Sequence, residues 1–409
     1  MKMKKNNSIL LPMVVLGTLF FIFGLVSWVN SILIPYFKAA FTLNHTQSYL
    51  VAFAFYIAYL VMSIPNSKLL TIIGHQKGMV AGLWMMAIGT FLFVPAAKTE
   101  SYPLFLTGLF VIGTGLSMLQ TVANPYVTVI GPIETAARRI SIVGLCNKIA
   151  GILAPLVFAA VILKGGSSEA DLSAVVMPYS VLSGFLFLFG CGVLLMKLPE
   201  ISNGAEKEGA KGRPLWSYPY FVLGVIALFA HVAEQIVSID TVISYAQSMG
   251  LTLQEAKIFP SITLGCSLIG YFAGIIAIPR FASQKQMLRI AVVTGLVLST
   301  LVLIIPGTFT VYGHAVSLSL LCINGLGFCN ALIYAGIWPL AIHDLGKKTD
   351  LASACMVMAL CGNGLMPLLY GVLADNWGLR PGYIVLLPCF IYLIYYAYRG
   401  YKIEKWGRN

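Results

Sequence analysis

The segment Leu119–Gly151 reads LQTVANPYVTVIGPIETAARRISIVGLCNKIAG and joins two apolar runs through a short basic turn. Gln120, Asn124 and Thr128 recur at a spacing of four, so they lie along one face of a helix. Lys148 follows the turn by about ten residues, which at about 1.5 Å per residue places it near the middle of a bilayer. A charge there costs about 2.5 kcal/mol or more in lipid. The segment therefore predicts two spanning helices and a partner for Lys148 in protein or water.

The composition argues against an ordinary soluble domain. Hydrophobic residues make up 59% of the 409 residues and the mean hydropathy is +0.88. Charged residues make up 10%, whereas about 25% is usual in soluble proteins. The net charge of +12 comes from Lys and Arg in short loops between apolar runs, so we predict no nucleic-acid partner. The eight cysteines lie inside apolar segments without paired spacing, and we predict no disulfide framework, metal site or cofactor.

Windows of about twenty apolar residues predict twelve membrane spans. The first run follows MKMKKNN and is too long for a signal peptide, so we interpret it as a helix. The longest non-apolar connection, residues 199–216, is a predicted cytoplasmic linker between an N-terminal half, residues 1–198, and a C-terminal half, residues 217–409. The predicted spans lie near residues 11–37, 47–72, 77–97, 102–130, 138–163, 176–197, 217–247, 257–281, 287–307, 313–345, 350–374 and 381–400.

The distribution of positive charge predicts the orientation. Of the 26 Lys and Arg residues, 20 fall on one side of the predicted membrane, five fall on the other, and the last is Lys148. Positively charged loops stay in the cytoplasm. We therefore predict a multi-pass protein of the cytoplasmic (inner) membrane with both termini in the cytoplasm.

The two halves resemble each other weakly. The fourth span ends in NPYVTVIGP and the tenth in WPLAIHDLG, and each is followed by a charged turn into the next helix. Transporters are often built from two such repeats, with the substrate site near the midplane between them. The predicted fold is an all-α membrane protein of twelve transmembrane helices, arranged as two six-helix repeats around a central cavity.

Three charged residues lie inside predicted spans: Lys148 in the fifth, and Glu234 and Asp240 in the seventh. Glu234 and Asp240 are six residues apart, so their side chains diverge by about 120° unless the helix is unwound there. Intramembrane carboxylates commonly carry the proton or cation of a coupled transporter. We predict that all three residues take part in cation coupling and that Lys148 pairs with a carboxylate of the seventh span. The alternative is a static ion pair that joins two helices.

Neutral polar and aromatic residues supply candidate sugar contacts. Amide side chains both donate and accept hydrogen bonds, which suits hydroxyl groups, and aromatic rings stack on the C–H faces of sugars. The alternative is that such stripes only pack helices together. The candidates are Gln120, Asn124, Asn147, Asn30, Trp28, Gln235, Asn330, Tyr334 and Trp338.

The chain resembles the fucose/glucose/galactose symporter group of the major facilitator superfamily over nearly its whole length. The resemblance lies in FGLVSWVNSILIPYFKAAFTL, TVANPYVTVIGP, CNKIAGILAP, AEQIVSIDTVISYAQSMGL, AGIWPLAIHDLG and GVLADNWGLR. In the proton-coupled L-fucose branch, carboxylates occupy the positions of Trp28 and Gln120, and a Gln occupies that of Gly144. Lys148 in CNK, with Glu234 and Asp240, is instead similar to the glucose and galactose branch.

The resemblance implies a secondary transporter that takes up a neutral hexose, glucose or galactose, together with a cation. The preferred cation is a proton, and sodium is the alternative. L-fucose with a proton remains an alternative. So does an anionic sugar, such as a hexuronate or sialic acid, bound through Lys148. A sugar sensor and an enzyme are weaker alternatives, because the sequence offers no signalling domain and no nucleophile–base pair. A drug exporter is also weaker, because the amide-rich polar face suits hydroxyl groups better than apolar cations. A monomer is the default in this superfamily.

Overall fold

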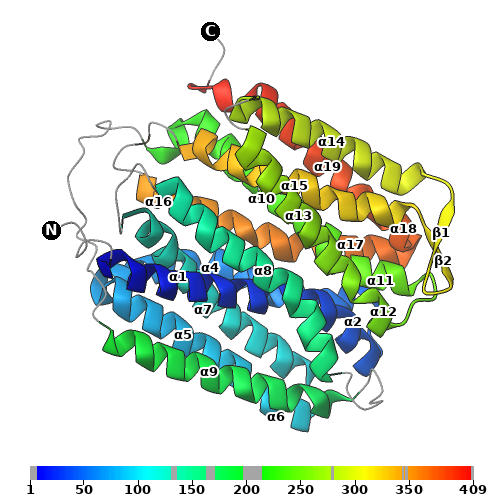
Figure 1. Cartoon of the computed structure of the whole chain (residues 1–409), viewed down its shortest axis with the longest axis horizontal. Helices are drawn as coiled ribbons and strands as arrows, with labels where there is room; N and C mark the ends of the chain where they lie inside the picture. Colours follow the sequence, from blue (N-terminus) through cyan, green and yellow to red (C-terminus); the bar gives the residue numbers. More distant parts are fainter. Residues whose placement is uncertain are drawn as a thin grey trace. The chain divides into compact units, whose positions relative to one another are not determined.

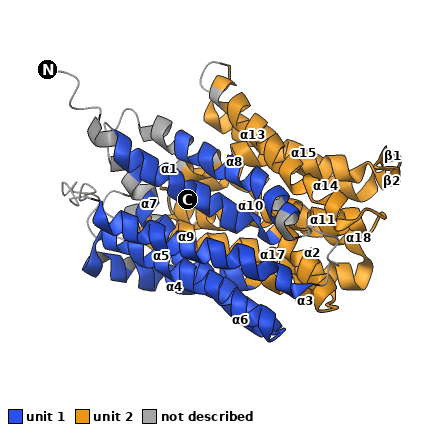
Figure 2. Cartoon of the chain, turned by 60° about the horizontal axis from the view of Figure 1, so that its bottom comes forward, with its two compact units in different colours: residues 1–30, 54–205 blue, residues 31–53, 206–409 orange. Residues whose placement is uncertain are grey.

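The computed structural model describes residues 7–129, 136–162, 171–196, 214–277, 281–342, 345 and 349–406. Long helices dominate these residues (Figure 1). Contacts divide the chain into two compact units, which Figure 2 shows in different colours. Unit 1 comprises Met1–Asn30 and Ala54–Ala205, and unit 2 comprises Ser31–Phe53 and Glu206–Asn409. The end of the first predicted span and the start of the second are thus grouped with the C-terminal part of the chain, while the predicted division at residues 199–216 stays a prediction.

Unit 1 is built from pairs of long apolar helices. Helix α1 packs on α8, and α5 packs on both α7 and α9. Its helices are α1 (Asn7–Trp28), most of α4 (Leu50–Ile73), α5 (His75–Phe91), α6 (Phe93–Lys98), α7 (Tyr102–Val129), α8 (Ala136–Ile162) and α9 (Val176–Leu195), with a short 3-10 helix at Leu172–Val175.

Unit 2 is organised around α10, which contacts α15, α17 and α19. Its helices are α2 (Asn30–Ala40) without its first residue, α3 (His45–Ser48), α10 (Pro219–Asp240), α11 (Val242–Gln247), α12 (Leu253–Ala256), α13 (Ile258–Ala277), α14 (Gln284–Ile304), α15 (Ser319–Ile342), α16 (Thr349–Met358), α17 (Gly362–Trp377), α18 (Leu379–Gly382) and α19 (Leu386–Tyr398). Short 3-10 helices lie at Leu215–Ser217, Ala359–Cys361, Tyr383–Val385 and Gly400–Lys402.

The described residues contain 11 helical stretches that are long and apolar enough to cross a membrane. The fifth predicted span, residues 138–163, corresponds to α8. Its apolar stretch, Ile142–Phe158, is shorter than these 11 and is not counted among them. Large apolar side chains stay exposed on the helix surfaces, for example Leu188 and Leu195 of α9. A soluble protein avoids such surfaces, whereas a lipid environment favours them.

Two predicted spans are broken where the sequence pattern alone is continuous. The first divides into α1 and α2 at Val29, and the seventh divides into α10 and α11 at Thr241. The second break lies directly after Asp240, so Glu234 and Asp240 both belong to α10. Broken helices inside membranes are tolerated where the freed backbone groups are buried in protein or line a cavity.

A β-hairpin replaces the start of the tenth predicted span. Strands β1 (Thr308–Val311) and β2 (His314–Ser317) pair antiparallel through a two-residue turn. Tyr312 and Gly313 both have positive φ, 49° and 82°, as a type I′ turn requires. The predicted boundary at residue 313 is therefore wrong, because the alternating pattern that precedes Ser319 forms a strand and not a helix.

Candidate functional site

Glu234 lies at the centre of a buried polar cluster in unit 2. Its side chain is fully buried, and its Oε1 atom lies 3.0 Å from Nδ1 of His231, one turn earlier on α10. Asn330 on α15 completes the cluster: with its amide nitrogen toward the carboxylate, it donates to Oε1 at 2.7 Å and to Oε2 at 3.1 Å. The packing of α15 on α10 brings the amide of Asn330 to the carboxylate, whereas the imidazole of His231 comes from α10 itself.

An aromatic stack continues this cluster along α15. Tyr334 and Trp338 lie one turn apart with ring centroids 5.9 Å from each other and planes 27° apart. The ring of His231 lies 6.1 Å from that of Tyr334. Tyr334 and Trp338 are half-buried, whereas Asn330 is fully buried. The structure thus brings together a carboxylate, an amide and stacked rings that the sequence singled out on two separate spans.

Asp240 does not belong to this cluster. It is fully buried at the last residue of α10, and neither carboxylate oxygen accepts a hydrogen bond from the residues that the structure describes. Thr241, which follows it, contacts Oη of Tyr383 at 2.7 Å. Burial of a carboxylate without hydrogen bonds is costly, which makes Asp240 a second candidate for a group that binds a cation. Gln235, next to Glu234, is half-buried.

Lys148 lies on α8 in unit 1, against the indole of Trp28. Its Nζ atom is 4.7 Å from the ring centroid, and both side chains are buried. Such cation–π contacts contribute about 2 kcal/mol when they are desolvated. Gly24 and Gly151 bring α1 and α8 close enough for this contact, since a Cβ atom at Gly151 would lie 2.4 Å from Cδ1 of Trp28. The pairing of Lys148 with Glu234, which belongs to the other unit, stays a prediction.

Gly151→Ala is expected to lower the free energy of unfolding by about 1–3 kcal/mol, the usual cost of overpacking. The new methyl group would displace the indole of Trp28 and the helix contact behind it. Thermal unfolding of the purified protein in detergent measures the effect. Gly144→Ala on the same helix is the matched control, because a Cβ atom there meets no atom within 4 Å. Equal melting temperatures of the two variants would contradict the close packing of Trp28 on Gly151.

The amide candidates of unit 1 have different environments. Gln120 donates to Oη of Tyr59 at 3.0 Å, and Asn147 donates to the backbone carbonyl of Phe20 at 3.2 Å. Asn30 is fully buried, and neither polar atom of its amide has a hydrogen-bond partner in the described part of the chain. The side chain of Asn124 lies outside the described residues.

Sequence reasoning missed Tyr59 as the partner of Gln120 and did not pair His231 with Glu234. Tyr59 was part of an apolar window, and nothing in its sequence context predicts that its hydroxyl meets Gln120. The i, i+3 spacing of His231 and Glu234 was a usable signal for a hydrogen bond along one helix face. Among the described residues, His, Cys, Asp and Glu side chains form no group of three or more that could hold a metal ion.

The sequence matches the family model described as Major Facilitator Superfamily over residues 16–350. It is 32% identical to the glucose/galactose transporter of Brucella abortus biovar 1 (strain 9-941), over 95% of this chain and 93% of that protein. It is 29% identical to the L-fucose-proton symporter of Escherichia coli (strain K12), over 98% of this chain and 95% of that protein.

Among solved structures, the fold is similar to the crystal structure of the E. coli fucose:proton symporter FucP. The TM-score is 0.72 and the identity 26%, over 95% of this chain and 98% of that one. The predicted all-α membrane fold of this group is thereby confirmed. The chain belongs to the Major Facilitator Superfamily, with relatives among the glucose/galactose transporters and the L-fucose-proton symporters.

Proposed function

We propose that the chain is a secondary active transporter that takes up a neutral hexose, glucose or galactose, together with a cation, a proton in the first place. The names of its relatives support a sugar as the substrate. The membrane spans and the superfamily support alternating access, in which the site opens to one side of the membrane at a time.

The observation that carries the proposal is the cluster of Glu234, Asn330, Tyr334 and Trp338. The amide and the imidazole can both donate to the ionised carboxylate, and an unprotonated ring nitrogen can accept from the protonated one. Glu234 can therefore keep a hydrogen bond to each of these groups when it gains or loses a proton. The stacked rings beside it offer the flat apolar surface on which a hexose packs. Asp240 is the second carboxylate that could carry the cation.

In this proposal Lys148 supplies a counter-charge during the cycle, and the polar side chains of unit 1 bind sugar hydroxyls. Asn30 supports this role most directly, because neither polar atom of its buried amide has a hydrogen-bond partner among the described residues, and a sugar hydroxyl would satisfy them. Gln120, Asn124 and Asn147 complete the proposed set of amides, with Trp28 as a further aromatic surface and Gln235 beside Glu234. We further propose a monomer in the inner membrane with both termini in the cytoplasm.

A counterflow experiment in proteoliposomes tests the substrate. Vesicles loaded with unlabelled glucose or galactose are expected to take up the labelled sugar faster than empty vesicles, because exchange through one site needs no ion gradient. A pH gradient, acid outside, is then expected to drive accumulation. Binding of labelled sugar without movement across the membrane would instead indicate a sensor, and would contradict the proposal.

The same panel separates the remaining alternatives. L-fucose is the sugar named for the second group of relatives, and preferential exchange of L-fucose would replace the hexose assignment. Exchange of a hexuronate that depends on Lys148 would assign an anionic sugar. Accumulation that follows the sodium gradient at constant pH would replace the proton by sodium, whose hard oxygen ligands would then come from Glu234 or Asp240.

A further inference from the structure

The short helix α3, in the connection between the first two predicted spans, is docked on the end of α17. The carboxylate of Asp375 accepts from the backbone N–H groups of His45 and Thr46, both at 2.8 Å, and from the hydroxyl of Thr46 at 2.6 Å. All of these residues belong to unit 2, although they are 329 and 330 positions apart in the sequence.

Asp375 caps the N–H groups at the start of α3 that the segment does not cap with its own side chains. The first four N–H groups of a helix have no partner inside the helix. Asn44 and Gln47 satisfy two of them through a reciprocal capping box, at 2.7 and 3.2 Å. Asp375 satisfies the other two. Helix α3 can therefore leave Asp375 and expose only two N–H groups to water, while its own capping box stays intact.

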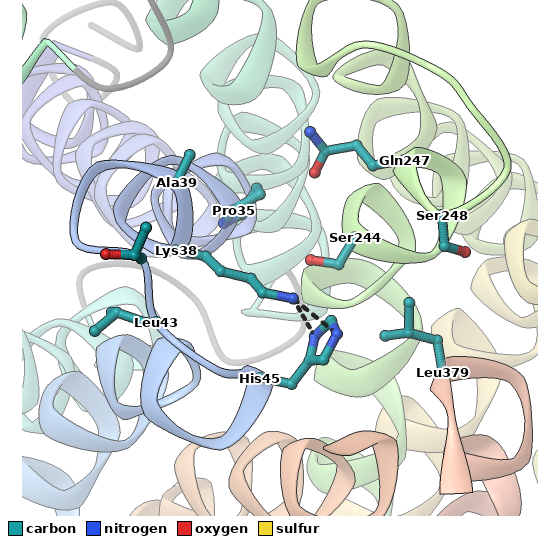
Figure 3. Close-up of a pocket in the computed structure, with 10 residues that line it drawn as sticks. Pro35, Lys38, Ala39, Leu43, His45, Ser244, Gln247, Ser248 and Leu379 are labelled. Carbon is teal, nitrogen blue, oxygen red and sulfur yellow. Dashed lines mark hydrogen bonds between the residues drawn. The ribbon is translucent and has the colours of Figure 1, made fainter. Parts of the chain in front are cut away.

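Lys38 makes a second contact at this place. Its Nζ atom lies 3.0 Å from Nδ1 and 2.7 Å from Nε2 of His45. The two side chains line a pocket of about 540 Å³. Figure 3 shows them meeting there, with Ser244, Gln247 and Ser248 nearby. An ammonium group donates to an imidazole only if the ring keeps a lone pair, so this contact requires neutral His45.

Next to these polar contacts, the α3 segment packs closely against α17 at Gly371. A Cβ atom at Gly371 would lie 2.6 Å from Cδ2 of Tyr49 and 2.9 Å from Cα of Thr46. The ring of Tyr49 packs edge-on against that of Tyr370, 5.6 Å between centroids, and Tyr370 contacts Tyr383 at 4.9 Å. Since Tyr383 contacts Thr241, this packing leads to the break after Asp240.

We propose that Asp375, His45 and Lys38 form a pH-sensitive latch between the predicted N-terminal half, which contributes Lys38 and α3, and the predicted C-terminal half, which contributes α17. If these two halves separate when the predicted outer side of the transporter opens, the latch must release. The proposal rests on the proposed transport function, because only a protein that alternates between two open states needs a releasable contact here. Its members are not part of the Glu234 cluster, and none was among the candidates for substrate or cation binding.

The pH dependence of the latch follows from the groups around His45. Burial first, and then the Lys38 ammonium, lower the pKa of the His45 imidazole, while Asp375 partly opposes them. Lys38 comes from α2 and Asp375 from α17, and the pocket-lining residues of α11 are neutral. In the released state the imidazole regains its ordinary pKa. Latching is therefore strongest above that ordinary value and weakens as the pH falls, so acid on the outer side favours opening.

Hydrogen exchange of the full-length protein in nanodiscs, without sugar, tests the latch. In Asp375→Ala, the protection of the His45 and Thr46 amides is expected to fall about five- to tenfold, the effect of losing a capping carboxylate. The Gln47 amide, held by Asn44, is the internal reference. Asp171→Ala is the matched control, because Asp171 caps the turn at Ser173 through a 2.9 Å bond within its own segment. That variant should leave positions 45 and 46 unchanged.

Two further measurements keep the proposal testable if Asp375→Ala does not fold. Gly371→Ala is expected to deprotect the same two amides, since its methyl group would push α3 away. In the wild-type protein, protection at these amides, corrected for intrinsic exchange, should fall between about pH 8 and pH 5.5, the range in which histidine titrates. His45→Gln should remove that pH dependence. Unchanged protection in Asp375→Ala or Gly371→Ala, or equal pH dependence in His45→Gln, would overturn the latch without bearing on the identity of the sugar.

Discussion

Replacing Glu234 by Gln is expected to abolish uphill accumulation of the hexose while exchange across the membrane persists. The amide has nearly the shape of a protonated carboxyl group and can keep hydrogen bonds to Asn330 and His231, but it cannot bind or release a proton. Sugar binding and alternating access would continue, whereas the pH gradient could no longer be converted into a sugar gradient. Counterflow and steady-state accumulation in the same proteoliposomes measure the two properties separately.

Glu255→Gln is the control for this experiment. Glu255 closes an exposed capping box at the start of α12, where Oε2 accepts from Thr252 at 2.8 Å, and its loss should leave accumulation as in the wild type. Full uphill uptake by Glu234→Gln would contradict the assignment of Glu234 as the coupling carboxylate. If Asp240→Asn then loses accumulation, the coupling carboxylate is the one at the break of the seventh span.

Hydropathy alone predicted most of the helices, because the bilayer imposes a length and an apolar surface on each one. The breaks at Val29 and Thr241 could not be predicted in this way. The polar residues beside them, Asn30 and Asp240, are too few to interrupt an apolar window of about twenty residues. The hairpin before Ser319 carried a visible signal, alternation around Tyr312 and Gly313, which the long apolar window obscured.

The composition of the candidate site was predictable, but its partners were not. Glu234 and Asp240 stood out because a charge within an apolar run is rare. The bonds from Asn330 to Glu234 depend on how α10 and α15 pack, and the bonds from α3 to Asp375 join positions 330 residues apart. No local pattern encodes such distances. His45 is an example, because its proposed role depends on its contacts with Lys38 and Asp375, which the sequence around it does not reveal.

Removing the charge of Lys148 is also expected to have a large effect on sugar accumulation. Lys148→Met keeps the length and the apolar stem of the side chain and removes the charge. If Lys148 is the counter-charge of a neutral-sugar transporter, the variant should keep binding of glucose or galactose and lose accumulation. If Lys148 instead binds the carboxylate of an anionic sugar, the variant should lose binding of that sugar altogether. Equilibrium binding and accumulation, measured with a hexose and with a hexuronate, separate these outcomes.

A double variant tests the predicted pairing of Lys148 with Glu234 without assuming any substrate. Removing one member of a buried ion pair typically costs about 3–5 kcal/mol, because the other charge stays buried without a partner. Lys148→Met and Glu234→Gln should therefore each lower the melting temperature, and the double variant should be more stable than the sum of the two effects predicts. Purely additive effects would mean that the two charges act independently. The contact with Trp28 would then stabilise the buried charge of Lys148, and the hydrogen bonds from His231 and Asn330 would stabilise Glu234.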